Sequence, residues 1–258
     1  MDLGIAGRRA LVCGSSQGLG YACARQLASE GVEVLLNGRD EAKLEKAAAA
    51  LTGEGGTVRF VAADQTSKEG RAAIIAAAGD IDILVNNNAG PPPGILPDWD
   101  EEALIGAVNA NMIPAIQFLR HFIPGMRERR FGRIVNITSA MVKSPRYFMG
   151  LSTSARAGLT AISKAISIEV ARENVTINNL LPERIDTPRQ VFMANRIVAE
   201  QGVSYDEARR QIADTIAAKR FGTPEEFAGA CAFLCSVQAG FISGQNIQVD
   251  GGSYEGLC

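Results

Sequence analysis

The chain has 258 residues, of which 47% are hydrophobic and 21% charged, and its formal net charge is −2. This balance is typical of a globular protein, and no dense run of Lys and Arg predicts a nucleic-acid surface. Residues 1–14 lack a signal-peptide core, and no apolar run is long enough to span a bilayer. We therefore expect a cytoplasmic protein without a nucleic-acid or membrane partner.

Short apolar segments alternate with helical patterns along the chain, and no linker or repeat divides it. We predict strands over residues 9–13, 32–37, 58–62, 81–86, 133–138, 176–181 and 247–249. We predict helices over 19–30, 40–51 (with Asp40 as N-cap), 68–78, 101–129, 152–173 and 224–234, and an irregular polar segment over 188–220. The alternation predicts one α/β domain, 1–258, with a Rossmann-type doubly wound parallel sheet of about seven strands and helices on both faces.

Cysteine spacing matches no metal site, and we predict no bound metal. The five cysteines are Cys13, Cys23, Cys231, Cys235 and Cys258. We interpret them as buried thiols in a reducing compartment. A basic cluster follows a helical spacing, and it comprises Arg127, Arg129, Arg130 and Arg133. We interpret this cluster as a solvated helix end, because cations favour helix C-termini.

The first predicted strand ends in a glycine-rich turn, Gly14-Ser15-Ser16-Gln17-Gly18-Leu19-Gly20. Such a turn lets the backbone approach a pyrophosphate, which then faces the N-terminus of the next helix. Close packing alone is the alternative explanation for glycines here. We predict a dinucleotide site in which the turn contributes Gly14, Ser16, Gln17, Gly18, Leu19 and Gly20.

The spacing Gly-x-x-x-Gly-x-Gly resembles that of the short-chain dehydrogenase/reductase family, and further matches cover nearly the whole chain. They include Asp64, the turn that starts Asn86-Asn87, Asn111, the strand ending in Ser139, the loop Pro182-Glu183-Arg184-Ile185-Asp186-Thr187 and the C-terminal Val249-Asp250-Gly251-Gly252. Within the family, the chain is most similar to bacterial β-ketoacyl reductases. The resemblance implies that Asp64 contacts the adenine and that Asn87 and Thr187 contribute to the cofactor site.

The end of the second strand predicts NADP as the cofactor, with NAD as the alternative. Family members that choose NAD usually carry an Asp at the position of Gly38, where it binds the ribose 2′-hydroxyl. Arg39 instead can pair with a 2′-phosphate through charge-assisted hydrogen bonds. A solvated turn residue is the other interpretation of Arg39.

The resemblance implies a catalytic site with two replacements. Family members reduce carbonyls with a Tyr that donates a proton and a Lys, four residues later, that holds the nicotinamide ribose. The aligned positions here hold Ser152 and Arg156, while Ser139 matches the carbonyl-orienting Ser and Asn111 the Asn that anchors a relay water. We predict these four as catalytic residues, with Arg156 also binding the ribose. Ser152 is a poor acid, so Tyr147 or a water is the alternative proton donor.

Two further positions depart from the family pattern. Asn88 and Ala89 stand where Ala and Gly are usual, unless one residue is inserted, and Glu183 stands where Gly is usual. We expect Glu183 to alter the backbone of the nicotinamide loop. We expect loop residues to form the substrate pocket. The apolar ones are Trp99, Met141, Tyr147, Phe148 and Met149. The basic ones are Lys143, Arg146 and Arg189, which favour an anionic or carrier-linked substrate.

Three functions remain open. The first is an NADP-dependent oxidoreductase acting on a small-molecule carbonyl/alcohol pair with an atypical catalytic site. The second is an NADP-binding family member with little redox activity, acting as a sensor or assembly partner; lyase or isomerase chemistry is a third. The helices that carry Asn111 and Ser152 are apolar beyond a single stripe, so we expect a homo-dimer or homotetramer.

Overall fold

The computed structural model describes residues 2–257. Among these residues, seven strands form one parallel sheet in the order β3-β2-β1-β4-β5-β6-β7. The strands are β1 (Arg9–Val12), β2 (Glu33–Gly38), β3 (Val58–Ala62), β4 (Ile83–Asn86), β5 (Gly132–Ile137), β6 (Val175–Pro182) and β7 (Asn246–Val249). The strand order reverses between β1 and β4, so the predicted doubly wound sheet is confirmed.

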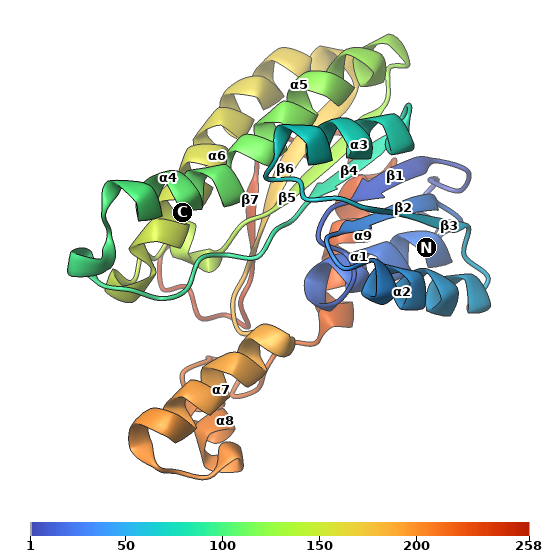
Figure 1. Ribbon diagram of the computed structural model, residues 1–258. Helices are drawn as coiled ribbons and strands as arrows, with labels where there is room; N and C mark the ends of the chain where they lie inside the picture. Colours follow the sequence, from blue (N-terminus) through green and yellow to red (C-terminus); the bar gives the residue numbers. More distant parts are fainter. Residues whose placement is uncertain (1, 258) are drawn as a thin grey trace.

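Helices cover both faces of the sheet (Figure 1). One face carries α1 (Gly18–Ser29), α2 (Glu41–Gly53) and α9 (Pro224–Cys235); the other carries α3 (Lys68–Ala78), α4 (Glu101–Asn111), α5 (Ile113–Glu128) and α6 (Gly150–Val170). Neighbouring residues of β1 belong to the hydrophobic cores on opposite faces of the sheet. Val12 packs with α1 and α9, whereas Leu11 packs with α5. Strand side chains alternate between faces, which explains why β1 is apolar at every buried position. Within the described chain, no helix has the length and apolarity needed to cross a membrane.

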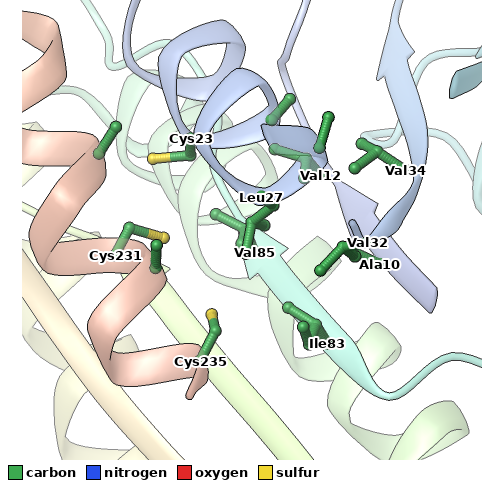
Figure 2. Close-up of a cluster of buried hydrophobic side chains, with 14 of the residues drawn as sticks. Ala10, Val12, Cys23, Leu27, Val32, Val34, Ile83, Val85, Cys231 and Cys235 are labelled. Carbon is green, nitrogen blue, oxygen red and sulfur yellow. The ribbon is translucent and has the colours of Figure 1, made fainter. Parts of the chain in front are cut away.

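The seam between α1 and α9 contains three of the cysteines. Figure 2 shows Cys23 of α1 facing Cys231 of α9, beside Leu27 and Val85. Cys13, Cys23, Cys231 and Cys235 are all free and buried, as predicted, whereas Cys258 lies outside the described residues. Burial raises the pKa of Cys13 to about 12, so this thiol stays protonated at neutral pH.

The helix predicted over 101–129 is two helices, α4 and α5, separated at Met112. Met112 has φ −124° and ψ −56°, outside the helical range. Pro114 causes the break, because it has no N–H to donate to the carbonyl of Ala110. The side chain of Asn88 donates to that carbonyl instead, at 2.8 Å.

The segment predicted to be irregular, 188–220, contains two helices, α7 (Pro188–Gln201) and α8 (Tyr205–Asp214). They form a pair that projects from the end of the sheet (Figure 1). Ala194, Ala208 and Ile212 form a small core between them. The prediction was wrong because most positions of this pair face water, so its polar composition hid a narrow apolar stripe.

Arg133 contradicts the interpretation of the basic cluster as a solvated helix end. It lies on β5 and is only 1% exposed. Its guanidinium donates to the carbonyls of Ser236, Gly132 and Asn174. Arg133 therefore connects β5 to the start of β6 and to the end of α9. Arg127 also departs from full solvation, since it pairs with Glu173 at 2.9 Å.

Four short 3₁₀ turns complete the described structure: η1 (Leu96–Asp98), η2 (Ala140–Val142), η3 (Tyr147–Met149) and η4 (Ala171–Glu173). Two of them, η2 and η3, belong to the loop between β5 and α6. That loop passes over the carboxyl ends of the strands, where sheets of this kind bind ligands.

Candidate active site

A cleft of about 450 Å³ lies at the carboxyl ends of the strands. Its walls come from the β1–α1 turn, the segments after β4, β5 and β6, and the starts of α6 and α7. Nine predicted site residues line it: Gly14, Gln17, Gly18, Leu19, Asn87, Ser139, Ser152, Arg156 and Thr187. The remaining predicted residues do not line it: Ser16, Gly20, Arg39, Asp64 and Asn111.

The β1–α1 turn has the geometry of an anion-binding loop. Gly14 and Gly18 have φ values of +56° and +63°, which favour glycine. A Cβ at Gly20 would lie 2.3 Å from the carbonyl oxygen of Gly14, so only glycine lets α1 approach the turn this closely. The N-cap residue of α1, Gln17, makes no capping hydrogen bond with its side chain. The first N–H groups of α1 therefore remain available for a phosphate.

The end of β2 lies beside this turn. A Cβ at Gly38 would lie 3.6 Å from Oγ of Ser16, so the two segments are in contact. Arg39 follows Gly38 and is exposed. Hydrogen bonds from Thr66 lower the pKa of Asp64, and the charge of Arg39 lowers it further. Ser16, Arg39 and Asp64 thus lie around the β2 and β3 ends of the sheet, outside the main cleft.

The segment after β4 departs from the family pattern at Asn88, and the two asparagines before it occupy defined positions. Asn86 is paired with Asn136 in the sheet, and the side chain of Asn87 donates to the carbonyl of Gly14 at 3.0 Å. The departure from the family pattern therefore lies after the strand. There, the backbone oxygen of Asn88 accepts a hydrogen bond from Arg156 at 3.1 Å.

Ser152 and Arg156 lie one turn apart on α6, and both are buried. The guanidinium of Arg156 donates to the carbonyl of Ile137 at 2.8 Å and to Oγ of Ser152 at 3.3 Å. Burial, together with the charge of Arg189, lowers the pKa of Arg156 to about 10. The group therefore stays charged at neutral pH and anchors α6 to the ends of β4 and β5.

Asn111 faces a second, smaller cavity. Its volume is about 20 Å³, and Asn111, Asn88 and Arg156 are among its lining residues. Both amide atoms of the Asn111 side chain are buried without a hydrogen-bond partner in the described structure. This volume suffices for one water molecule, which fits the predicted relay role of Asn111.

The aromatic residues of the predicted pocket divide into two groups. Phe148, Met149 and Met141 line the cleft, whereas Tyr147 and Trp99 do not. Tyr147 is 63% exposed, and its hydroxyl oxygen accepts a hydrogen bond from the backbone of Leu96. The structure therefore does not place Tyr147 among the residues that line the cleft, where the alternative proton donor would act. Among the predicted basic residues, Arg146 and Arg189 line the cleft, but Lys143 stacks over Tyr254 instead.

The nicotinamide-type loop contains a residue that the sequence reasoning missed, Arg184. Glu183 adopts no left-handed conformation and pairs with Arg146 at 2.5 Å. The strained position is instead Arg184, whose φ is +56°. Arg184 lines the cleft, as do Gln190 and Met193 of α7. The sequence signal for Arg184 was its place in the loop 182–187, and that for Gln190 and Met193 was their place after β6.

Comparison with known proteins places this geometry in a family. The family model described as enoyl-(acyl carrier protein) reductase matches residues 14–254. The chain belongs to the short-chain dehydrogenase/reductase family. It is 32% identical to the NADPH-dependent reductase BacG of Bacillus subtilis, over 97% of this chain and 99% of that protein.

Two further members of the short-chain dehydrogenase/reductase family bear on the site. The crystal structure of L-sorbose reductase from Gluconobacter frateurii, complexed with NADPH and L-sorbose, matches with a TM-score of 0.94 and 32% identity, covering 100% of both chains. The chain is also 32% identical to BbsC of Thauera aromatica, a subunit of (2S)-[(R)-hydroxy(phenyl)methyl]succinyl-CoA dehydrogenase, over 95% of this chain and 94% of that protein. These findings support the predicted oxidoreductase class and NADP as its cofactor.

Proposed function

We propose that this protein is an NADP-dependent oxidoreductase that acts on a small-molecule carbonyl/alcohol pair with an atypical catalytic pair, Ser152 and Arg156. The observation that carries the proposal is the single cleft, in which the glycine turn, Ser139 and the start of α6 surround one space. Two relatives support it: BacG is named as an NADPH-dependent reductase, and L-sorbose reductase was crystallised with NADPH and L-sorbose.

The residues fit NADP, and each has a distinct task. When bound, the cofactor supplies or accepts the hydride. The N-terminus of α1 and the turn from Gly14 to Gly20 hold the pyrophosphate, while Thr187 lies against Gly18 at the other side of the turn. Arg156 donates to the ribose hydroxyls as a fixed cation, because a guanidinium does not release its proton.

Proton transfer is the weak step of this site. Ser139 lies in the cleft with Ser152, and its hydroxyl orients the substrate carbonyl. Oγ of Ser152 accepts from Arg156, so its own proton remains available to a ligand or water in the cleft. A serine hydroxyl is a far weaker acid than a tyrosine, so we propose that a water held between Ser139 and Ser152 completes proton delivery.

A second candidate function is a cofactor-binding subunit with little redox activity. The absence of a tyrosine among the described cleft residues favours it, and so does the relative BbsC, which is named as a subunit of a dehydrogenase. A screen of ketones and alcohols with NADPH and NADP separates the two functions. The oxidoreductase proposal expects turnover that falls at least 10-fold in Ser139→Ala; NADPH binding without turnover of any compound supports the subunit.

We also propose a cytoplasmic homo-dimer or homotetramer. The supporting observation is a set of exposed apolar side chains on the helices of the site. Leu104 and Ile105 of α4 are 42% and 52% exposed, and Ile168 of α6 is 72% exposed. Pairing of these helices between copies would remove that apolar surface from water.

Arg39 is expected to set the preference for NADP over NAD. Arg39→Ala should weaken NADP binding roughly 10-fold and leave NAD binding unchanged, because only NADP carries the 2′-phosphate. Titration calorimetry with both cofactors measures this difference, and Lys46→Ala, an exposed cation on α2, is the control. Equal affinities of the wild type for NADP and NAD would refute the assignment.

A further inference from the structure

The cleft is strongly cationic although the whole chain is slightly acidic. Its charged lining residues are four arginines and one glutamate: Arg146, Arg156, Arg184, Arg189 and Glu183. Only one of these arginines is neutralised, because Glu183 pairs with Arg146 at 2.5 Å. The cleft therefore contains more positive charge than its own side chains balance, and a bound ligand of negative charge would complete it.

Arg184 has neither a side-chain partner nor a relaxed backbone to account for its position in the cleft. Its backbone carbonyl accepts a hydrogen bond from Gly222. Its side chain makes no hydrogen bond or ion pair with any described residue, and Nε is buried without a partner. Burial lowers the pKa of Arg184, and the neighbouring charge of Arg146 lowers it further. Its backbone is held at φ +56°, where an arginine is strained. Strain and an unsatisfied charge together at a cleft indicate a binding role.

The cofactor accounts for a different part of the positive charge. Arg189 follows Thr187 at the start of α7, and a Cβ at Gly18 would lie 4.0 Å from Thr187. The charge of Arg189 also lowers the pKa of Arg156, so these two cations lie near each other, and Arg156 is the residue that we propose binds the ribose. Arg184 instead interacts electrostatically with Arg146 and Glu183. Arg146 comes from the loop between β5 and α6, which also places Phe148 and Met149 in the cleft.

We propose that Arg184 binds an anionic group, a carboxylate or a phosphate, on the carbonyl substrate. This inference rests on the proposed function and names the substrate class of the same site. Its guanidinium can form two parallel hydrogen bonds to either anion, and partial burial strengthens them. Phe148, Met149 and Met193 then contact the carbon chain between the anion and the carbonyl.

Matched pairs of ligands test the proposal by binding. The carboxylate pair is 4-oxopentanoate and its methyl ester, and the phosphate pair is dihydroxyacetone phosphate and dihydroxyacetone. Titration calorimetry with and without saturating NADP measures each affinity for the wild type, Arg184→Gln, Arg184→Lys and Arg189→Gln. Arg196→Gln is the matched control, because Arg196 is exposed on α7 and pairs with Glu200 away from the cleft.

We expect the wild type to bind at least one anion about 10-fold more tightly than its neutral partner. Arg184→Gln should remove that preference, while Arg184→Lys retains part of it and Arg196→Gln retains all of it. No preference in either pair, or a preference that survives Arg184→Gln, would overturn the proposal, and its disappearance in Arg189→Gln alone would assign the anion to Arg189. Because the anion preference is measured without cofactor as well, a failure to bind NADP would refute the proposed function separately.

Discussion

The Ser152→Tyr/Arg156→Lys double variant is expected to reduce small ketones with NADPH about 10²–10⁴-fold faster than the wild type, the contribution of a positioned general acid. The two positions lie one turn apart on α6 and face the cleft beside Ser139. Tyrosine at position 152 adds a proton donor next to the carbonyl. Lysine at position 156 places a compact cation beside it, which lowers its pKa.

Each single variant should gain much less than the double. Tyrosine alone would face the bulky guanidinium of Arg156, and lysine alone would leave Ser152 as the only donor. Gly90 lies close to the side chain of Ser152, since a Cβ at Gly90 would lie 3.4 Å from Oγ of Ser152. The tyrosine ring must therefore extend into the cleft rather than toward Gly90. Steady-state rates of NADPH oxidation, with NADPH affinity as the control, measure the effect. A double variant that binds NADPH normally and gains no activity would show that α6 does not present these positions as we describe.

Replacement of Arg133 is expected to cause the largest loss of stability. Arg133→Ala should lower the free energy of unfolding by about 3–5 kcal/mol, because it leaves buried carbonyls unsatisfied and opens a cavity. The oxygens that lose their partner belong to Ser236, Gly132 and Asn174. The guanidinium also stacks on Phe131, 4.4 Å from the ring centroid.

Two comparison variants separate these causes in urea denaturation. Arg133→Met fills most of the cavity but makes no hydrogen bonds, so its free energy of unfolding should lie between that of the wild type and that of Arg133→Ala. Arg120→Ala removes an exposed arginine from α5 and should change stability by less than about 0.5 kcal/mol. If Arg133→Ala were as stable as Arg120→Ala, the hydrogen bonds of Arg133 would contribute nothing to the fold.

Local chemistry explains why much of the fold could be predicted from the sequence. The alternation of apolar strands and helices set the element order, and side-chain caps fixed several boundaries. Asp40, for example, accepts a hydrogen bond from the backbone of Lys43 at the start of α2, as predicted. The glycine turn was also recognisable, because its left-handed φ values and close approach to α1 permit few other residues.

The features that escaped prediction depend on contacts between distant segments. Arg133 stands 103 residues from Ser236, so its burial has no local signature. Tyr147 is close to Ser152 in the chain, but it turns outward to contact the loop before α4. Arg184 gave no signal of its own either, because its strained backbone becomes visible only once β6 and the loop after β5 are placed in space. Tertiary context decided each of these positions.

Single-turnover hydride transfer tests the central proposal, NADP-dependent redox chemistry at this site, most directly. The enzyme, in excess over NADPH deuterated at the transferred C4 position, is mixed with a ketone that the carbonyl screen identifies as a ligand. Mass spectrometry then measures deuterium in the alcohol. We predict slow, enzyme-dependent transfer that falls at least 10-fold in Ser139→Ala. Normal NADPH binding with no deuterium above the enzyme-free reaction would contradict the proposal and favour the cofactor-binding subunit.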